Sequence, residues 1–335
     1  MKDIIWKFGC IACIAVLLAL SVVNSATAGE SESETKYTIG ITQIVTHPAL
    51  DANRKGFVDQ MEQEGFIEGK NVEYDIRNAE SDMSLASSIA QKFVSKNVDL
   101  ILSIATPTSQ ASVNKIKGED IPVVFGSVTD PVSAGLVDSW EHPGGNVTGV
   151  SDWADVGAQV ELITDVVSGV KNLGVVYNSG ETNSKVQVEE LKEVAPEYGI
   201  EKVSEASVAS SANIMTSAQS LMGRVDAVWV PTDNTVVSGF EALVKICEDN
   251  NVPLFAADTA TVKRGAIGTP GIDYYELGQQ DAKLAARILG GENAGEIPVQ
   301  RMEMNKLYLN PSAAERMGVT IPQPVLDRAT DIVSE

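Results

Sequence analysis

From residue 37 onward, short apolar runs alternate with longer stretches in which apolar positions recur every three or four residues. Short apolar runs are typical of buried parallel strands, and the longer stretches are typical of amphipathic helices that cover a sheet. In the first half, the pattern predicts strands over residues 37–45, 71–77, 98–104 and 121–125, with helices over 48–65, 82–96 and 107–117 between them.

The same alternation restarts near residue 155. It predicts helices over 155–167, 182–198, 213–222 and 235–250, strands over 173–177, 226–230 and 253–257, and a long helix over 273–289, with which we expect the chain to return to the first half. The pattern therefore predicts an α/β fold of two similar lobes with parallel sheets, joined by crossovers. Residues 37–152 plus 274–300 are expected to form the first lobe, and residues 153–273 plus 301–335 the second.

The N-terminal segment predicts an export signal over residues 1–28. Two lysines precede an apolar run over 11–23, and Ala-Thr-Ala at 26–28 forms a small-x-small site, so we expect cleavage before Gly29. The apolar run is shorter than the roughly 20 residues that span a bilayer, although an uncleaved anchor is the alternative. Residues 29–36 are polar and charged, which favours a flexible leader.

Charge and cysteine content exclude several classes of protein. The formal net charge of -21 argues against nucleic acids and anionic membrane surfaces as partners. Cys10 and Cys13 precede most of the apolar run of the signal, where a lipoprotein processing site does not belong. Cys247 lies among apolar residues of a predicted helix, so we expect a packed thiol rather than a reactive one. A chain of this length can hold its core without a disulfide.

Polar loops follow most of the predicted strands. In open α/β sheets ligands meet the loops at the carboxyl ends of strands, and a cleft between two lobes is a preferred site. The candidate ligand-binding residues on these loops are Gln43, Thr46, Thr106, Thr108, Ser127, Thr129 and Asp130 in the first lobe, and Asn178, Glu181, Asn183, Ser184, Asp233, Asn234 and Asp258 in the second.

This set of side chains favours a zwitterionic ligand. Hydroxyls and the free N–H groups of a helix N-terminus suit a carboxylate, and acids suit an ammonium. We expect Thr108 and Ser127 to bind the carboxylate and Asp233 the ammonium, with Glu181 and Asp258 as the next acids to consider. The alternative is that these residues only cap helices, because Ser, Thr, Asp and Asn are common there. The same loops also fit purines or small sugars.

Enzyme signatures are largely missing from the sequence. There are two histidines, no G-x-S-x-G and no G-x-x-x-x-G-K-[ST], so neither a catalytic triad nor an ATP-binding loop is indicated. We expect no catalytic residue, metal or cofactor. Among the aromatic residues, Trp229 is predicted to be in the core, Trp153 is a cleft candidate, and either Tyr274 or Tyr275 is expected to line the hinge.

Several segments, in this order along the chain, resemble a known family. They are Thr106-Pro-Thr108 and the stretches at 125–131, 143–149, 231–235, 271–278 and 309–322. Together they look like the ABC-transporter substrate-binding family that includes tryptophan- and tyrosine-binding proteins.

The resemblance implies a type I periplasmic-binding-protein-like fold, with two Rossmann-like lobes joined by a hinge, and no catalysis. It also implies a permease and an ATPase as partners, and a location in the periplasm or at the outer face of the cytoplasmic membrane. We therefore expect an exported, monomeric solute-binding protein that captures an apolar or aromatic amino acid by hinge closure. A ligand-binding sensor, or a binder of a nucleoside or small sugar, is the alternative.

Overall fold

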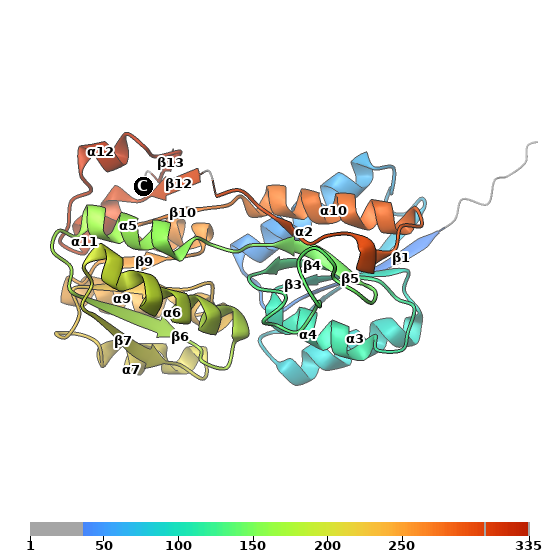
Figure 1. Cartoon of the computed structure of the whole chain (residues 1–335), viewed down its shortest axis with the longest axis horizontal. Coiled ribbons are helices and arrows are strands. Elements are labelled where there is room, and N and C mark those ends of the chain that lie inside the picture. The colour runs from blue at the N-terminus through green and yellow to red at the C-terminus, as the bar shows by residue number, and fades with distance from the viewer. Residues whose placement is uncertain (1–35, 305, 334–335) are drawn as a thin grey trace, which may run out of the picture. The chain divides into compact units, whose positions relative to one another are not determined.

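The computed structural model describes residues 36–304 and 306–333 (Figure 1). The predicted export signal over 1–28 lies outside the described residues, as does nearly all of the predicted leader. Within the described residues, no helix is long and apolar enough to cross a membrane.

The first lobe is built on a parallel sheet of six strands in the order β11-β5-β4-β3-β1-β2. Its strands are β1 (Tyr37–Gln43), β2 (Val72–Asn78), β3 (Leu100–Ile104), β4 (Val123–Val128), β5 (Val147–Ser151) and β11 (Gln300–Arg301). Its helices are α2 (Pro48–Gln63), α3 (Met83–Lys96), α4 (Thr106–Lys115) and α10 (Tyr274–Leu289).

The second lobe contains a parallel sheet of four strands in the order β7-β6-β8-β9 and a separate sheet in the order β10-β12-β13. Its strands are β6 (Asn172–Tyr177), β7 (Lys202–Ser207), β8 (Ala227–Val230), β9 (Leu254–Ala256), β10 (Gly268–Gly271), β12 (Lys306–Leu309) and β13 (Asp331–Ile332). Its helices are α5 (Val156–Val166), α6 (Thr182–Val194), α7 (Ile214–Gln219), α8 (Asn234–Val237), α9 (Phe240–Asn250), α11 (Pro311–Arg316) and α12 (Gln323–Leu326).

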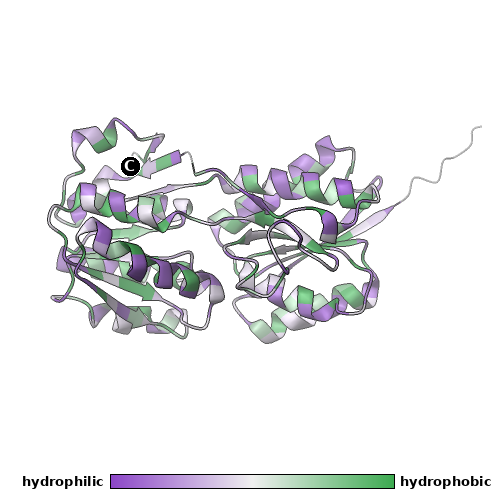
Figure 2. Ribbon diagram, in the orientation of Figure 1, coloured by the Kyte–Doolittle hydropathy of each residue, from purple (hydrophilic) through white to green (hydrophobic). Residues whose placement is uncertain are grey.

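Each lobe has its own hydrophobic core. One cluster of buried side chains draws on residues 39–150 and 272–297, and the other on residues 154–267 and 309–325. Figure 2 shows hydrophobic residues concentrated along the strands, with helices that are hydrophobic on one side only. The α/β class with parallel sheets is confirmed. These two clusters support the proposed division into lobes, with the chain passing between them after β5, before α10 and after β11.

The return of α10 to the first lobe depends on a very close approach to α2 (Figure 1). A Cβ added at Gly56 would lie 2.0 Å from the carbonyl oxygen of Tyr275, and one at Gly278 would lie 1.9 Å from that of Asn53. Buried Asn53 also donates from Nδ2 to Asp281 at 2.8 Å. Only glycine permits this spacing between the two helices. Gly56 and Gly278 therefore allow α10, at the end of the crossover, to pack closely on the first lobe.

Several elements differ from the sequence-based prediction, which also lacked β10 to β13, α11 and α12. β5 was not predicted because its sequence, VTGVS, contains few apolar residues. β7 was not predicted because it is an edge strand with alternating exposed polar residues. The predicted helix over 235–250 is broken at Gly239 into α8 and α9. The predicted helix over 182–198 becomes a 3-10 turn from Ala195, because Pro196 cannot continue the α-helical hydrogen bonds.

The close contact between α2 and α10 gives a stability prediction. Gly278→Ala should lower the free energy of unfolding by about 1–3 kcal/mol, because the added methyl group meets backbone that cannot move away easily. Gly290→Ala, at the exposed end of the same helix with a φ of -76°, should change it by less than about 0.5 kcal/mol. Urea denaturation of both variants measures the difference. Equal stabilities would show that the helices can separate without cost.

Candidate functional site

Side chains from both lobes line a small buried cavity, here called the inner cavity. Its volume is about 10 Å³, which is room for about one water molecule. The lining residues of the first lobe are His47, Leu50, Thr106, Ser127 and Thr129; those beside the crossovers are Asp152 and Tyr274; and those of the second lobe are Asn183, Thr232, Asp233, Asn234, Val237 and Asp258.

The first-lobe wall is shaped by unusual backbone. Ala105, between β3 and α4, has φ 80° and ψ 153°, a region that is essentially restricted to glycine. Ser127, near the end of the neighbouring strand β4, has φ 54°. Strain of this kind costs of order 1–3 kcal/mol for each residue and tends to occur at functional sites. The conformation of Ala105 places the N-terminus of α4 beside the inner cavity, where Thr106 lines the wall. This helix N-terminus has no side-chain cap.

Four buried polar atoms of the inner-cavity residues have no hydrogen-bond partner among the described residues. They are Nε2 of His47, Oγ1 of Thr106, Oγ of Ser127 and Oδ1 of Asn183. These residues are at most 4% exposed. An unsatisfied buried polar group costs about 1–3 kcal/mol, so native structures rarely keep one without a function. Four around one cavity indicate a site that hydrogen-bonds a polar ligand.

Three carboxylates also line the inner cavity. Asp152 accepts hydrogen bonds from the Thr129 hydroxyl at 3.1 Å and the Tyr274 hydroxyl at 3.2 Å. Asp258 caps a short 3-10 turn, and its Oδ2 lies 3.4 Å from Nδ1 of His47 in the other lobe. The third is Asp233. In the described part of the chain, no lysine or arginine lines this cavity, so the site has acids to bind a cation but no permanent cation of its own.

A second cavity, here called the outer cavity, lies next to the first and shares Asn234 with it. Its volume is about 280 Å³. It is lined by Ile44, Ser81, Met83, Pro107 and Gln110 of the first lobe and by Asn178, Gly180, Glu181, Ala209, Asn234 and Thr235 of the second. Aliphatic and polar groups alternate on its walls, so it can accept a mainly apolar side chain with a polar tip.

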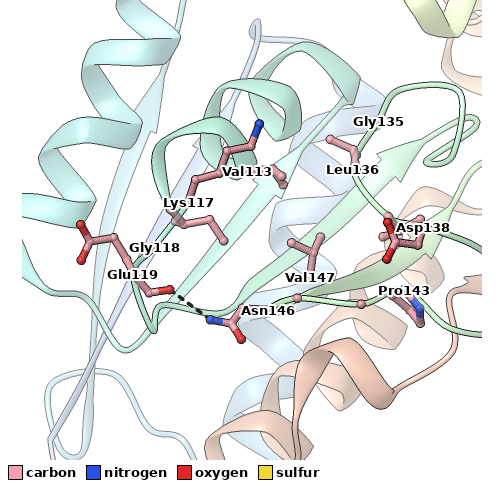
Figure 3. Close-up of a pocket in the computed structure, with 14 residues that line it drawn as sticks. Val113, Lys117, Gly118, Glu119, Gly135, Leu136, Asp138, Pro143, Asn146 and Val147 are labelled. Atoms are coloured by element: carbon pink, nitrogen blue, oxygen red, sulfur yellow. Dashed lines mark hydrogen bonds between the residues drawn. The ribbon is translucent and has the colours of Figure 1, made fainter.

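A larger groove of about 430 Å³ lies elsewhere, on the first lobe alone (Figure 3). It runs from the C-terminal end of α4 to Asn146 and Val147 at the amino end of β5, where the Asn146 side chain donates to the carbonyl of Glu119. Ligands of open α/β sheets meet the opposite, carboxyl ends of the strands. None of the groove's lining residues has an unpartnered buried polar atom. Size alone therefore does not identify this groove as the site.

Comparison with known proteins identifies the kind of protein to which this site belongs. A tyrosine-binding protein from Clostridioides difficile is 40% identical over 281 residues, covering 84% of this chain and 81% of the relative. The family model described as ABC transporter substrate binding protein matches residues 38–333. The chain belongs to this substrate-binding family. It is a family of solute-binding proteins, so the predictions of family membership and of a non-enzymatic role are confirmed.

Two solved structures are similar to this substrate-binding protein over 89% of its chain and 100% of theirs. An ABC domain from Streptococcus pneumoniae in complex with L-Trp is 36% identical, with a TM-score of 0.86. The ligand-free, open structure of a substrate-binding protein from Clostridium difficile is 40% identical, with a TM-score of 0.68. These likenesses confirm the periplasmic-binding-protein-like fold class.

The structure brings most of the predicted ligand-binding residues to the two cavities of the substrate-binding protein. Lining the inner cavity are Thr106, Ser127, Thr129, Asn183, Asp233, Asn234 and Asp258. Lining the outer cavity are Asn178, Glu181 and, again, Asn234.

Five predicted residues line neither cavity, because local hydrogen bonds hold their side chains elsewhere. Gln43 bonds Asp51 and Arg54 of α2, and Thr46 accepts a bond from Asn78. Thr108 donates back to the carbonyl of Ile104 at 2.6 Å, and Asp130 accepts bonds within its own turn from the N–H groups of residues 132 and 133. Ser184 donates to Asp233 at 2.6 Å. In this arrangement the Thr108 hydroxyl donates to backbone carbonyls, and its expected contact with a ligand carboxylate stays a prediction.

The second-lobe acids act mainly as caps. Asp233 is the N-cap of α8 and accepts from the N–H groups of Val236 and Asn178 and from the Ser184 hydroxyl, at 2.6–2.7 Å. Glu181 accepts from the backbone and side chains of Asn234 and Thr235. With three donors on one carboxylate, Asp233 is less able to bind an ammonium than Asp152 or Asp258.

Four polar members of the inner cavity were not among the predicted ligand-binding residues: His47, Asp152, Thr232 and Tyr274. His47 follows the first strand, and its position there was the available signal. Asp152 directly follows β5, and because β5 was not predicted as a strand, no ligand-binding loop was predicted after it. Tyr274, one of the two tyrosines expected at the hinge, lines the cavity beside a crossover. Trp153 instead stacks on Arg301, whose guanidinium lies 5.3 Å from its ring, and Trp229 is fully buried in the core as predicted.

Burial changes the ionisation of two inner-cavity acids. Loss of hydration raises the pKa of Asp152 to about 6. Loss of hydration, together with the negative charge of Glu181, raises the pKa of Asp233 to about 7. A cation that enters the cavity would favour the charged form of both acids.

The raised pKa of Asp152 gives a prediction on stability without ligand. Because the folded-state pKa exceeds the unfolded value, Asp152 contributes stability at low pH that is lost as the pH rises through about 6. Between pH 5 and 7.5, the wild type should lose about 1 kcal/mol more unfolding free energy than Asp152→Asn, which keeps the shape and cannot ionise. Urea denaturation across this range tests it. Parallel pH profiles would contradict a raised pKa.

Proposed function

We propose that this protein is the extracytoplasmic binding component of an ABC importer and captures tyrosine or tryptophan between its lobes. The observation that carries the proposal is the likeness, at a TM-score of 0.86 and 36% identity, to a structure in complex with L-Trp. The 40% identical tyrosine-binding protein supports the same class of ligand. The partners would be a permease and its ATPase, and the protein would act as an exported monomer.

The two ends of an amino acid fit different parts of the inner cavity. The N-terminus of α4, with the hydroxyls of Thr106 and Ser127, suits the carboxylate because a helix N-terminus carries partial positive charge. Asp152 and Asp258 suit the ammonium. The aromatic ring would extend into the outer cavity, against the aliphatic side chains of Ile44, Met83 and Pro107.

The size of the inner cavity supports hinge closure as the binding mechanism. A volume of about 10 Å³ is too small for the carboxylate and ammonium of an amino acid. The lobes would have to separate for the ligand to enter, and would close around it slightly further apart than they are here. The higher TM-score to the L-Trp complex than to the ligand-free, open structure supports a closed arrangement here. Ligand would then shift the balance between open and closed forms, because it contacts both lobes only in the closed form.

The prediction on ligand binding compares two equally buried threonines, one in the inner cavity and one outside both cavities. L-Tyrosine or L-tryptophan should raise the melting temperature, with a stabilisation of about 2.7 kcal/mol at a concentration of 100 times Kd. Thr106→Val should weaken binding about 10–100-fold, because a hydrogen bond to a carboxylate is lost. Thr42→Val, which removes an equally buried and unpartnered hydroxyl away from both cavities, should leave affinity unchanged.

Thermal shift and calorimetric titration measure these effects. Strong stabilisation by a nucleoside or sugar, with no effect of aromatic amino acids, would replace the ligand class and leave the family unchanged. Equal losses in the two valine variants would mean that Thr106 does not contact the ligand.

A separate prediction concerns closure. Small-angle X-ray scattering should give a smaller radius of gyration with saturating tyrosine or tryptophan than without ligand, because the ligand-free lobes are expected to stand apart. A sugar that does not bind serves as the control. The same radius of gyration in all samples would mean that the lobes do not move.

A further inference from the structure

We propose that His47 is a ligand-binding residue that donates a hydrogen bond from Nε2 to the carboxylate of the bound amino acid. This inference rests on the proposed function, because it specifies how that site recognises one end of its ligand. His47 lies at the start of the first lobe's helix α2 and lines the inner cavity together with Thr106 and Ser127.

The hydrogen bonds of the ring indicate which nitrogen carries the proton. His47 is the N-cap of α2, and its Nδ1 accepts from the N–H of Ala49 at 3.3 Å. A neutral imidazole that accepts at Nδ1 carries its proton on Nε2. Burial lowers the pKa of His47, which favours this neutral form. The ring therefore presents an N–H donor from Nε2.

That donor lacks an acceptor within the described protein. The side chain of His47 is 2% exposed, and Nε2 has no hydrogen-bond partner. An unsatisfied buried N–H costs about as much as the hydrogen bond that would satisfy it. The groups around it on the first-lobe wall are the unpartnered hydroxyls of Thr106 and Ser127 and the N-terminus of α4. All of them can donate, so an acceptor on the ligand satisfies the whole set.

The charge of the cavity explains why a histidine donor matters here. Three aspartates line the inner cavity, and no lysine or arginine lines it among the described residues. The nearby Arg264 instead forms a two-pronged ion pair with Glu241, at 2.7 and 2.8 Å. A ligand carboxylate would therefore meet negative side chains with only neutral donors to hold it. The Nε2–H of His47 is the side-chain donor that adds to the hydroxyls without needing a permanent charge.

Asp258 of the second lobe lies close to the same ring. Its Oδ2 is 3.4 Å from Nδ1 of His47, and its Oδ1 accepts from the N–H of Ala260 at 2.7 Å. Because Nδ1 carries no proton in this neutral form of the ring, the approach of Asp258 is not a hydrogen bond. The ring is positioned within the first lobe by the bond that Nδ1 accepts from Ala49.

The test separates ligand binding from helix capping. In His47→Asn, asparagine is as good an N-cap as any residue, but its short side chain cannot reach where Nε2 lies. The variant is titrated at about pH 6.5 with L-tyrosine and with tyramine, which keeps the ammonium and the ring but has no carboxylate. Affinity for L-tyrosine should fall about 10–100-fold, while affinity for tyramine should change less than about threefold.

Two further variants complete the design. His47→Gln places an N–H near the position of Nε2 and should recover part of the lost affinity for L-tyrosine, and it also provides a second test if His47→Asn does not fold. Asp82→Asn changes the N-cap of α3, outside both cavities, and should affect neither ligand. Equal losses for both ligands, or no loss for either, would overturn the proposal and leave His47 as a cap. A wild type that binds no aromatic amino acid would instead contradict the proposed function.

Discussion

The strained connection between β3 and α4 is the constraint on which the site depends. Ala105 adopts φ 80° and ψ 153°, a conformation that costs an alanine of order 1–3 kcal/mol. This turn places the first residue of α4 at the inner cavity, and Ser127 reaches the same cavity from β4 through its own positive φ. Two neighbouring strands therefore end in strained residues whose polar groups converge. A relaxed turn would direct the N-terminus of α4 elsewhere and remove the strongest anion-binding feature of the first lobe.

Charge is divided between the lobes and the crossovers in a way that matches this geometry. Donors without permanent charge occupy the first-lobe wall, while acids lie at a crossover, at Asp152, and in the second lobe, at Asp258. The formal net charge of -21 describes the whole sequence and does not determine which groups line the buried site. Its selectivity would come from the placement of a few buried groups rather than from the overall electrostatic field.

The sequence predicted the fold and most of the cavity from one rule, that ligands meet the carboxyl ends of parallel strands. Thr106, Ser127 and Asp258 follow strands that apolar runs made visible, and all three line the inner cavity. Asp152 was missed because β5 contains Thr148 and Gly149 and did not read as a strand. Thr108 shows the opposite limit: it lies two residues after Thr106 in α4, and its hydroxyl donates back to the carbonyl of Ile104 instead of facing the cavity. Hydrogen bonds of this kind depend on backbone angles that a residue pattern does not contain.

The same buried polar atoms would contribute to both ligand recognition and closure of the lobes. When the lobes are apart, water can satisfy His47, Thr106, Ser127 and Asn183; when they close without ligand, four polar atoms are buried without partners. At about 1–3 kcal/mol each, this penalty amounts to about 4–12 kcal/mol. Moving a two-state equilibrium from 1:99 to 99:1 takes about 5.5 kcal/mol. A ligand that satisfies all four atoms therefore removes a penalty large enough to switch the protein from open to closed. The groups that select the ligand would thus also make closure conditional on it, and no separate latch is needed.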